Sequence, residues 1–295
     1  MRLRLIAGSI LVAFTAAACG GGGDGPADTG ASDRFGQPLA DAEAYPVFAS
    51  PEIVVGENRL LVGLLNQDDA PIGSPKIEVH MSFFDLSRSE EEPVTEADLR
   101  FVPIDRFRGV YVADVTFESA GRWGAEATIQ GDGYDEVVRT KLPPILEETT
   151  TPQIGERVPS VDTPTADDVA KLSEISTDRD PSPRFYEQSI AEAVRAGDPF
   201  VVIFATPKFC QSATCGPMLK IVQKVAPQFP NLTFIHVEPY DLDKVPDQLA
   251  PVPSALKWGL PSEPWTFVVG EGARLEAKYA VVLSPEELRS SLEAL

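Results

Sequence analysis

The stretch FVVIFATPKFCQSATCGPMLK, from Phe200 to Lys220, decides the fold of the last third of the chain. Its first six residues form an unbroken apolar run, which is typical of a strand buried on both faces of a sheet. Cys210 and Cys215 follow this run, and Pro217 is tolerated best in the first turn of a helix. The stretch therefore predicts a buried strand, a loop that carries cysteine, and a helix that begins near Cys215.

Helices and strands are also predicted on both sides of this stretch. Upstream, residues 185–196 have an amphipathic pattern that ends at Gly197. Downstream, the pattern predicts a helix over 218–229, a strand over 232–237, a hairpin of strands over 265–269 and 275–282, and a terminal helix. Ser284 and Glu287 form a capping box at the start of that last helix. Residues 184–295 are therefore expected to form an α/β domain.

This order of elements, with cysteine after the first central strand, resembles the thioredoxin superfamily over residues 184–295. The sequence CGP at 215–217 is similar to the opening of the Cys-Gly-Pro-Cys motif, and EPW at 263–265 resembles the segment in which the family places a cis-proline beside its disulfide. The resemblance implies thiol-disulfide exchange by Cys210 and Cys215. It also implies that Glu263, Pro264 and Trp265 bind the substrate.

The spacing of the cysteines departs from the family pattern. Met218 stands where the second cysteine would be, and four residues separate Cys210 from Cys215. Regular helix would hold these Cα atoms too far apart for a disulfide, so residues 211–214 must form a loop. A position at a helix N-terminus favours Cys215 as the more acidic thiol, whereas the family pattern makes Cys210 the attacking residue. Both assignments stay open.

The cysteine pair has a second interpretation. Two cysteines close in sequence in an exported protein often form a permanent structural disulfide. The alternative function is therefore a non-catalytic binding module that keeps the thioredoxin-like fold and uses the disulfide as a staple.

The buried acid of the thioredoxin family is missing, because Val202 occupies its aligned position. His236 falls on the neighbouring predicted strand, and a histidine with a pKa near neutrality could move the proton instead. We consider a catalytic His236 as one hypothesis and a buried, hydrogen-bonded core histidine as the other.

Composition disfavours several other functions. A formal charge of −20 would repel nucleic acid, and two histidines cannot form a multi-histidine zinc site. We therefore predict no metal site, no cofactor and no nucleic-acid partner. Copper handling as in the Sco family is a minor alternative, although residues 247–263 contain no histidine. Peroxiredoxin-like activity is another, because Ser212 and Cys215 have the Ser/Thr-x-x-Cys spacing of that family.

The N-terminal half of the chain has a different pattern. Residues 59–65, 76–84 and 109–117 are strand-like runs separated by turn-forming clusters, so 46–146 is expected to be an all-β sandwich. The stretch 109–129, in which residues 117–123 turn between two predicted strands, resembles immunoglobulin-like modules of exported bacterial proteins. Residues 147–183 are rich in Pro, Thr and acidic residues, which predicts an interdomain linker. Residues 166–175 have some helical character, which favours packing of this part of the linker on the next domain.

The first residues indicate export. Two arginines precede an uncharged run over residues 5–18, which predicts a signal peptide over 1–18. The sequence AAAC at 16–19 resembles a bacterial lipobox, and the glycines that follow predict a flexible stalk over 19–45. We expect Cys19 to be lipidated, so that the membrane-anchored protein faces the extracytoplasmic side. Its expected partners are thiols and disulfides of exported proteins and an unknown redox donor.

We expect mass spectrometry of the mature protein to find Cys19 as a lipid-modified N-terminal residue, because lipidation would leave an even number of cysteines for pairing. Cleavage after Ala18 with an unmodified Cys19 would contradict the anchor and indicate release as a soluble protein.

Overall fold

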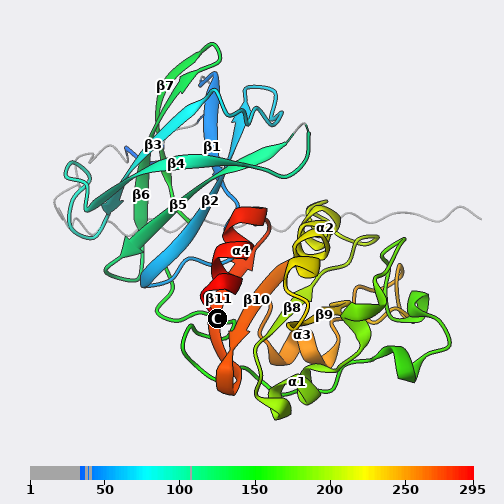
Figure 1. Ribbon diagram of the computed structural model, residues 1–295. Coiled ribbons are helices and arrows are strands. Elements are labelled where there is room, and N and C mark those ends of the chain that lie inside the picture. The colour runs from blue at the N-terminus through cyan, green and yellow to red at the C-terminus, as the bar shows by residue number, and fades with distance from the viewer. Residues whose placement is uncertain (1–33, 37–38, 40–41, 107) are drawn as a thin grey trace, which may run out of the picture. The chain divides into compact units, whose positions relative to one another are not determined.

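The structure, a computed structural model, describes residues 34–36, 39, 42–106 and 108–295. The predicted signal peptide, Cys19 and most of the predicted stalk lie outside the described residues. Residues 34–295 form one compact unit, and its strands belong to two sheets, of seven and four strands (Figure 1). In the described ranges, no helix has the length and apolar character needed to cross a bilayer.

Seven antiparallel strands make the first sheet, in the spatial order β1-β2-β5-β4-β3-β6-β7. β4 joins the two halves of this sheet, because its residues 95–99 pair with β3 and its residues 100–103 pair with β5. The edge strands β1 and β7 approach each other, and the backbone N–H of Glu43 donates to the Glu136 carboxylate at 3.0 Å. The sheet is therefore nearly closed. The strands are β1 Ala44–Phe48, β2 Gly56–Asn66, β3 Glu78–Asp85, β4 Thr95–Pro103, β5 Gly109–Phe117, β6 Trp123–Gly131 and β7 Tyr134–Lys141.

Alternate side chains along the strands of the seven-stranded sheet point into a core that the sheet encloses. In β3, Val79, Met81 and Phe83 are buried, whereas His80 and Ser82 between them are partly exposed. Every described regular element between residues 42 and 141 is a strand, which confirms the predicted all-β N-terminal region. Side chains from both halves of the sheet fill the core, among them Leu60, Val62, Met81, Phe83, Tyr111, Phe117, Trp123 and Ile129.

Three strands of this sheet were not predicted from the sequence: β1, β4 and β7. In β4, Glu96, Asp98 and Arg100 are exposed and alternate with less exposed residues, so no apolar run marks the strand. β1 begins at Ala44, inside the predicted stalk, so the ordered region starts slightly earlier than expected.

The second sheet has four strands in the order β11-β10-β8-β9. β8 and β9 are parallel, and the other neighbours are antiparallel. The strands are β8 Phe200–Phe204, β9 Thr233–Val237, β10 Trp265–Gly270 and β11 Arg274–Ala280. The helices are α1 Ile190–Ala196, α2 Cys215–Val225, α3 Pro253–Lys257 and α4 Pro285–Glu293, with short 3₁₀ turns η3 Pro183–Tyr186, η4 Ala226–Gln228 and η5 Glu271–Ala273.

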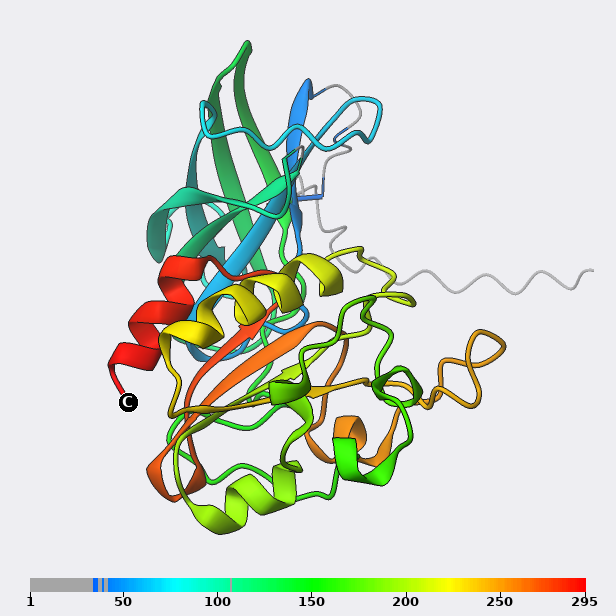
Figure 2. The ribbon, with the colours of Figure 1, turned by 45° about the vertical axis from the view of Figure 1, so that its right-hand side comes forward.

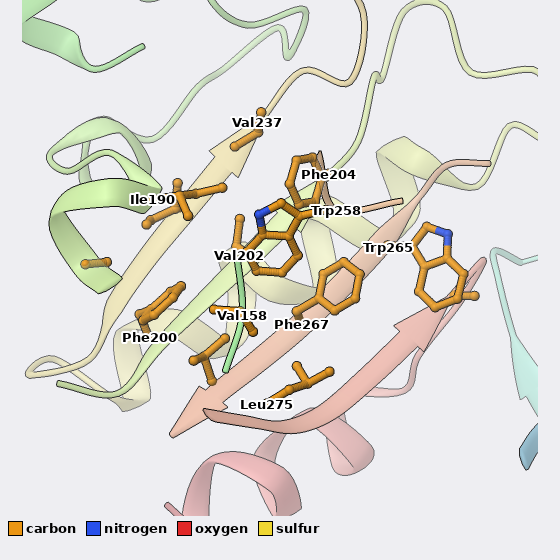
Figure 3. Packing of buried hydrophobic residues seen from close by; sticks show 14 of the residues in the cluster. Val158, Ile190, Phe200, Val202, Phe204, Val237, Trp258, Trp265, Phe267 and Leu275 are labelled. Atoms are coloured by element: carbon orange, nitrogen blue, oxygen red, sulfur yellow. The ribbon is translucent and has the colours of Figure 1, made fainter. Parts of the chain in front are cut away.

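β8 is a central strand of this sheet, and all five of its residues are fully buried. Phe200, Val202 and Phe204 belong to a core cluster that includes Trp258 and Phe267 (Figure 3). The intervening valine and isoleucine belong to a second cluster, to which α2 and α4 contribute. These two helices lie side by side (Figure 2). Burial on both faces explains why the sequence of β8 is apolar without interruption.

Capping residues set the ends of two helices. Ser189 caps α1 by accepting a hydrogen bond from the Glu192 N–H, and Gly197 ends it in a left-handed conformation with φ of 78°. The helix predicted from residue 185 therefore begins later, because residues 183–186 form the separate turn η3. α4 has the predicted capping box of Ser284 and Glu287.

The predicted linker over 147–183 packs along the four-stranded sheet and is hydrogen-bonded to it. Gly155 N–H donates to the Leu275 carbonyl at 2.7 Å, and Val158 N–H donates to the Ala273 carbonyl at 2.9 Å. These bonds satisfy backbone groups at the edge strand β11, which would otherwise be open to another chain. The helical character predicted for 166–175 corresponds to two 3₁₀ turns, η1 Ala166–Asp168 and η2 Leu172–Glu174.

Glu287 connects α4 to the seven-stranded sheet. Its carboxylate accepts hydrogen bonds from Arg59 at 2.7 and 3.1 Å, from the Ser284 N–H at 2.7 Å, and from Arg100. The side chain is only 14% exposed. Burial by itself would raise the pKa of Glu287, but the hydrogen bonds and charge of Arg59, together with Ser284 and Arg100, lower the pKa to about 2. The ion pair is therefore charged in the folded state down to strongly acidic pH.

We expect Glu287→Gln to lower the free energy of unfolding at pH 7 by up to about 3 kcal/mol, the equivalent of the pKa difference between unfolded and folded chain. Because the pKa falls on folding from an ordinary 4.5 to about 2, this stabilisation is complete above pH 4.5 and is lost as the pH falls toward 2. Chemical denaturation of the wild type and the variant at several pH values measures this difference in the free energy of unfolding.

The matched control is Glu286→Gln, because Glu286 is exposed and pairs with Arg289 on the same helix, at 2.7 Å. Equal effects of the two substitutions at pH 7 would contradict the role given to Glu287.

Candidate functional site

The cysteine loop leaves the end of β8 and enters α2. Cys210 and Cys215 are joined by a disulfide, with their Cα atoms 6.0 Å apart. The segment between them forms a loop, as the spacing predicts, and Ala213 in it has a left-handed φ of 58°. Thr214 is the N-cap residue of α2, so Cys215 is the first residue of the helix.

The two sulfurs have different surroundings. Cys215 is 0% exposed and packs in the cluster that contains Met218 and Leu219, whereas Cys210 is partly exposed. The backbone N–H of Cys215 donates to Cys210 Sγ at 3.2 Å, and Ser212 Oγ lies 3.3 Å from the same sulfur. An incoming thiol can therefore reach Cys210 and not Cys215.

This arrangement changes the argument for Cys215 as the more acidic thiol. The first N–H of α2 points at the sulfur of Cys210, which precedes the helix, so the stabilisation expected at a helix N-terminus acts on Cys210. Full burial raises the pKa of a thiol rather than lowering it. Exposure and hydrogen bonding both favour Cys210 as the attacking residue.

The segment before β10 brings an acid to the disulfide. The Glu263–Pro264 peptide bond is cis, in agreement with the resemblance. A carboxylate oxygen of Glu263 and the sulfurs of Cys210 and Cys215 all lie within 4.8 Å of one another. Tyr240, which follows β9, donates its hydroxyl to Glu263 Oε2 at 2.7 Å. Glu263 therefore lies beside the disulfide, and the segment that follows β9 fixes the orientation of its carboxylate.

Tyr240 was not predicted, although its position offered a signal. β8 and β9 are parallel, so the residues that follow their C-terminal ends meet at one edge of the sheet. Burial, and then the hydrogen bond to Glu263, raises the pKa of Tyr240, so its hydroxyl keeps the donating proton at neutral pH.

Glu238, which follows β9 directly, supports the cysteine loop through Thr177. The Glu238 carboxylate accepts from the Thr177 N–H at 2.5 Å and from its hydroxyl at 2.6 Å. Thr177 Oγ1 also accepts the backbone N–H of Lys208, at 3.2 Å. A residue of the predicted linker thus holds the start of the cysteine loop, which sequence reasoning missed.

Trp265, predicted to bind the substrate, is 3% exposed and stacks on Phe267 with ring centroids 5.7 Å apart. Trp258 is fully buried in the same cluster (Figure 3). Neither indole ring is available to a client chain, so packing accounts for both residues.

The structure does not bring His236 together with the cysteines. Its Nε2 lies 2.9 Å from the Ala205 carbonyl and its Nδ1 lies 2.6 Å from the Tyr186 hydroxyl. Because a carbonyl can only accept, Nε2 carries the proton and Nδ1 accepts from Tyr186. Burial lowers the pKa of His236 to about 4, so the ring is neutral at pH 7. This geometry favours the core histidine over the catalytic one.

Val202, at the aligned position of the family's acid, lies in the core cluster on the other face of the sheet from Cys215. In the described part of the chain, the disulfide and Glu263 form the one cluster of three side chains of types that can bind metal. Since the two sulfurs are bonded to each other, we assign no metal to this site.

A hollow of about 510 Å³ lies near the disulfide and Glu263. Its lining includes Tyr240, which donates a hydrogen bond to Glu263. Asp162, Glu174 and Asp243 line the hollow, and its Lys244 is paired with Asp241 at 2.7 Å. The lining of this hollow is therefore acidic.

No protein-family model matches the sequence, and no curated protein matches it either. Among solved structures, the chain is similar to FdeC, an adhesin of Escherichia coli, with 14% identity over 39% of this chain and a TM-score of 0.21. The match spans 38% of the adhesin chain. A likeness of this size supports no conclusion about fold or function.

Proposed function

We propose that this chain is an exported, lipid-anchored thiol-disulfide oxidoreductase that exchanges disulfides through Cys210 and Cys215. One observation above all supports this proposal: in the disulfide at the N-terminus of α2, Cys210 is partly exposed and its sulfur accepts a hydrogen bond, whereas Cys215 is buried. An accessible attacking thiol and a protected resolving thiol are what ordered exchange requires.

The proposed fold of residues 184–295 is thioredoxin-like. The supporting features are a parallel pair β8 and β9 with α2 between them in sequence, an antiparallel hairpin β10–β11, and a final helix α4. A further supporting feature is the cis peptide bond between Glu263 and Pro264, because the Glu263 carboxylate lies next to the disulfide. For the N-terminal sheet we propose an immunoglobulin-like sandwich that serves as a spacer or docking domain.

The proposed reaction, in the reducing direction, begins with the Cys210 thiolate. It attacks one sulfur of a client disulfide, so that a bond between Cys210 and the client forms while the client disulfide breaks and releases a thiolate. Cys215 then attacks Cys210 Sγ, which restores the Cys210–Cys215 disulfide and releases the second client thiolate. Two electrons pass to the client, and a thiol donor must reduce the pair again.

The proposed partners follow from this chemistry and from export. They are thiols and disulfides of exported proteins, together with a redox donor on the same side of the membrane. The direction of exchange depends on the redox potentials of the pair and the donor.

The competing function is a binding module in which the disulfide is a permanent staple. The complete burial of Cys215 favours this alternative too, because a buried sulfur is protected from reduction. An assay of thiol-disulfide exchange distinguishes the oxidoreductase from the binding module.

With dithiothreitol as donor, we expect the wild-type protein to accelerate insulin reduction and both Cys210→Ser and Cys215→Ser to lose this activity. Cys215→Ser should accumulate a mixed disulfide with a disulfide-containing peptide, whereas Cys210→Ser should not, because only Cys210 is accessible. Mass spectrometry identifies the adduct. No acceleration by the wild-type protein, with no adduct on either variant, would support the staple.

A further inference from the structure

We propose that Glu263 is the proton acceptor that activates Cys215 in the resolving step of exchange. This inference rests on the proposed function and assigns the proton transfer to an acid that precedes the cis-proline.

The geometry gives Glu263 access to both sulfurs. A carboxylate oxygen of Glu263 lies within 4.8 Å of Cys215 Sγ and of Cys210 Sγ. Such a distance is spanned by one water molecule or by a side-chain rotation when the disulfide opens, and catalytic hydrogen bonds are often long before the reactive complex forms. Glu263 is partly exposed, so a proton that it accepts can pass on to solvent.

Tyr240 fixes the carboxylate for this role. Its hydroxyl donates to Oε2 at 2.7 Å, which leaves Oε1 to face other partners. Because the pKa of Tyr240 is raised, first by burial, the phenol stays a donor and does not compete for the proton of Cys215. The carboxylate is therefore held in place by a neighbour that cannot replace it as a base.

Cys215 needs such a base because its own surroundings disfavour a thiolate. The residue is 0% exposed and lies among apolar side chains, where the charged form of a thiol is destabilised. The N–H that could stabilise a thiolate at the start of α2 is donated to Cys210 Sγ instead.

The other positions that could supply a proton acceptor do not serve Cys215. Both ring nitrogens of His236 bond to Tyr186 and Ala205. Val202 has no ionisable group, and its side chain lies on the opposite face of the sheet from Cys215. The Glu238 carboxylate accepts from Thr177 through Oε1 and does not belong to the cluster that Cys210, Cys215 and Glu263 form.

The resolving step moves one proton and exchanges one disulfide bond for another. In the mixed disulfide, the Glu263 carboxylate accepts the proton of the Cys215 thiol, and the sulfur electron pair attacks Cys210 Sγ. The Cys210–Cys215 bond forms, the bond between Cys210 and the client breaks, and its electron pair leaves on the client sulfur. The client thiolate takes a proton from water, and Glu263 later returns its own proton to water.

The test separates the two steps of exchange by rapid mixing of the fully reduced protein with a peptide disulfide, followed by acid quench and mass spectrometry. We expect Glu263→Gln, which keeps an oxygen for Tyr240, to form the mixed disulfide at the wild-type rate but to resolve it about a hundredfold more slowly. Glu263→Asp should restore part of the rate. Glu271→Gln, at an exposed position in η5, is the matched control and should resolve at the wild-type rate.

A wild-type resolution rate in Glu263→Gln would overturn the inference, and so would equal slowing of both steps, which would indicate a structural role. The Cys215→Ser variant distinguishes this failure from failure of the proposed function. If Cys215→Ser captures the peptide while Glu263→Gln resolves normally, only the role of Glu263 is wrong. If Cys215→Ser captures nothing, the exchange reaction itself is wrong, and the inference with it.

Discussion

The complete burial of β8 is the constraint on which the rest of the C-terminal region depends. The strand lies between β9 and β10, and its residues alternate between two core clusters. A strand so enclosed has no freedom of register, because a shift of one residue would exchange the side chains of the two cores. The chain therefore leaves β8 at a fixed point, and that point places the cysteine loop next to Glu263 and the cis-proline.

The functional contrast within the disulfide follows from where α2 begins. With Thr214 as N-cap, the side chain of Cys215 turns into the core while its backbone N–H points back at Cys210. The longer spacing moves the other cysteine off the helix and into the loop. The spacing thus gives the hydrogen bond of the helix terminus to the sulfur of the partly exposed Cys210 and leaves the buried Cys215 without it. In our proposal the buried thiol therefore depends on an external base, Glu263.

Much of this architecture could be predicted from the sequence, because strong local signals marked it. The apolar run at 200–205, the hairpin of β10 and β11 and the capping box at Ser284 are such signals. β4 was missed because its exposed charges hide the strand pattern. Packing of part of 147–183 on the C-terminal region was expected, but the hydrogen bonds of Gly155 and Val158 beside β11 were not, because they are long-range. For the same reason the site was only partly predictable. The cysteines and Glu263 follow from motifs. The contact of Tyr240 with Glu263 depends on the end of β9 and the start of β10 meeting at one edge of the sheet, and the partners of His236 depend on tertiary packing.

The central claim is that the Cys210–Cys215 disulfide is reversible under physiological conditions. The most direct measurement is its reduction potential, obtained by equilibrating the protein with glutathione or dithiothreitol buffers and quantifying free thiols after acid quench. Oxidoreductases of this kind have potentials between about −270 and −120 mV, whereas structural disulfides in exported proteins lie below about −300 mV. We predict a value in the first range; a value below about −300 mV would contradict the account and identify the pair as a structural staple.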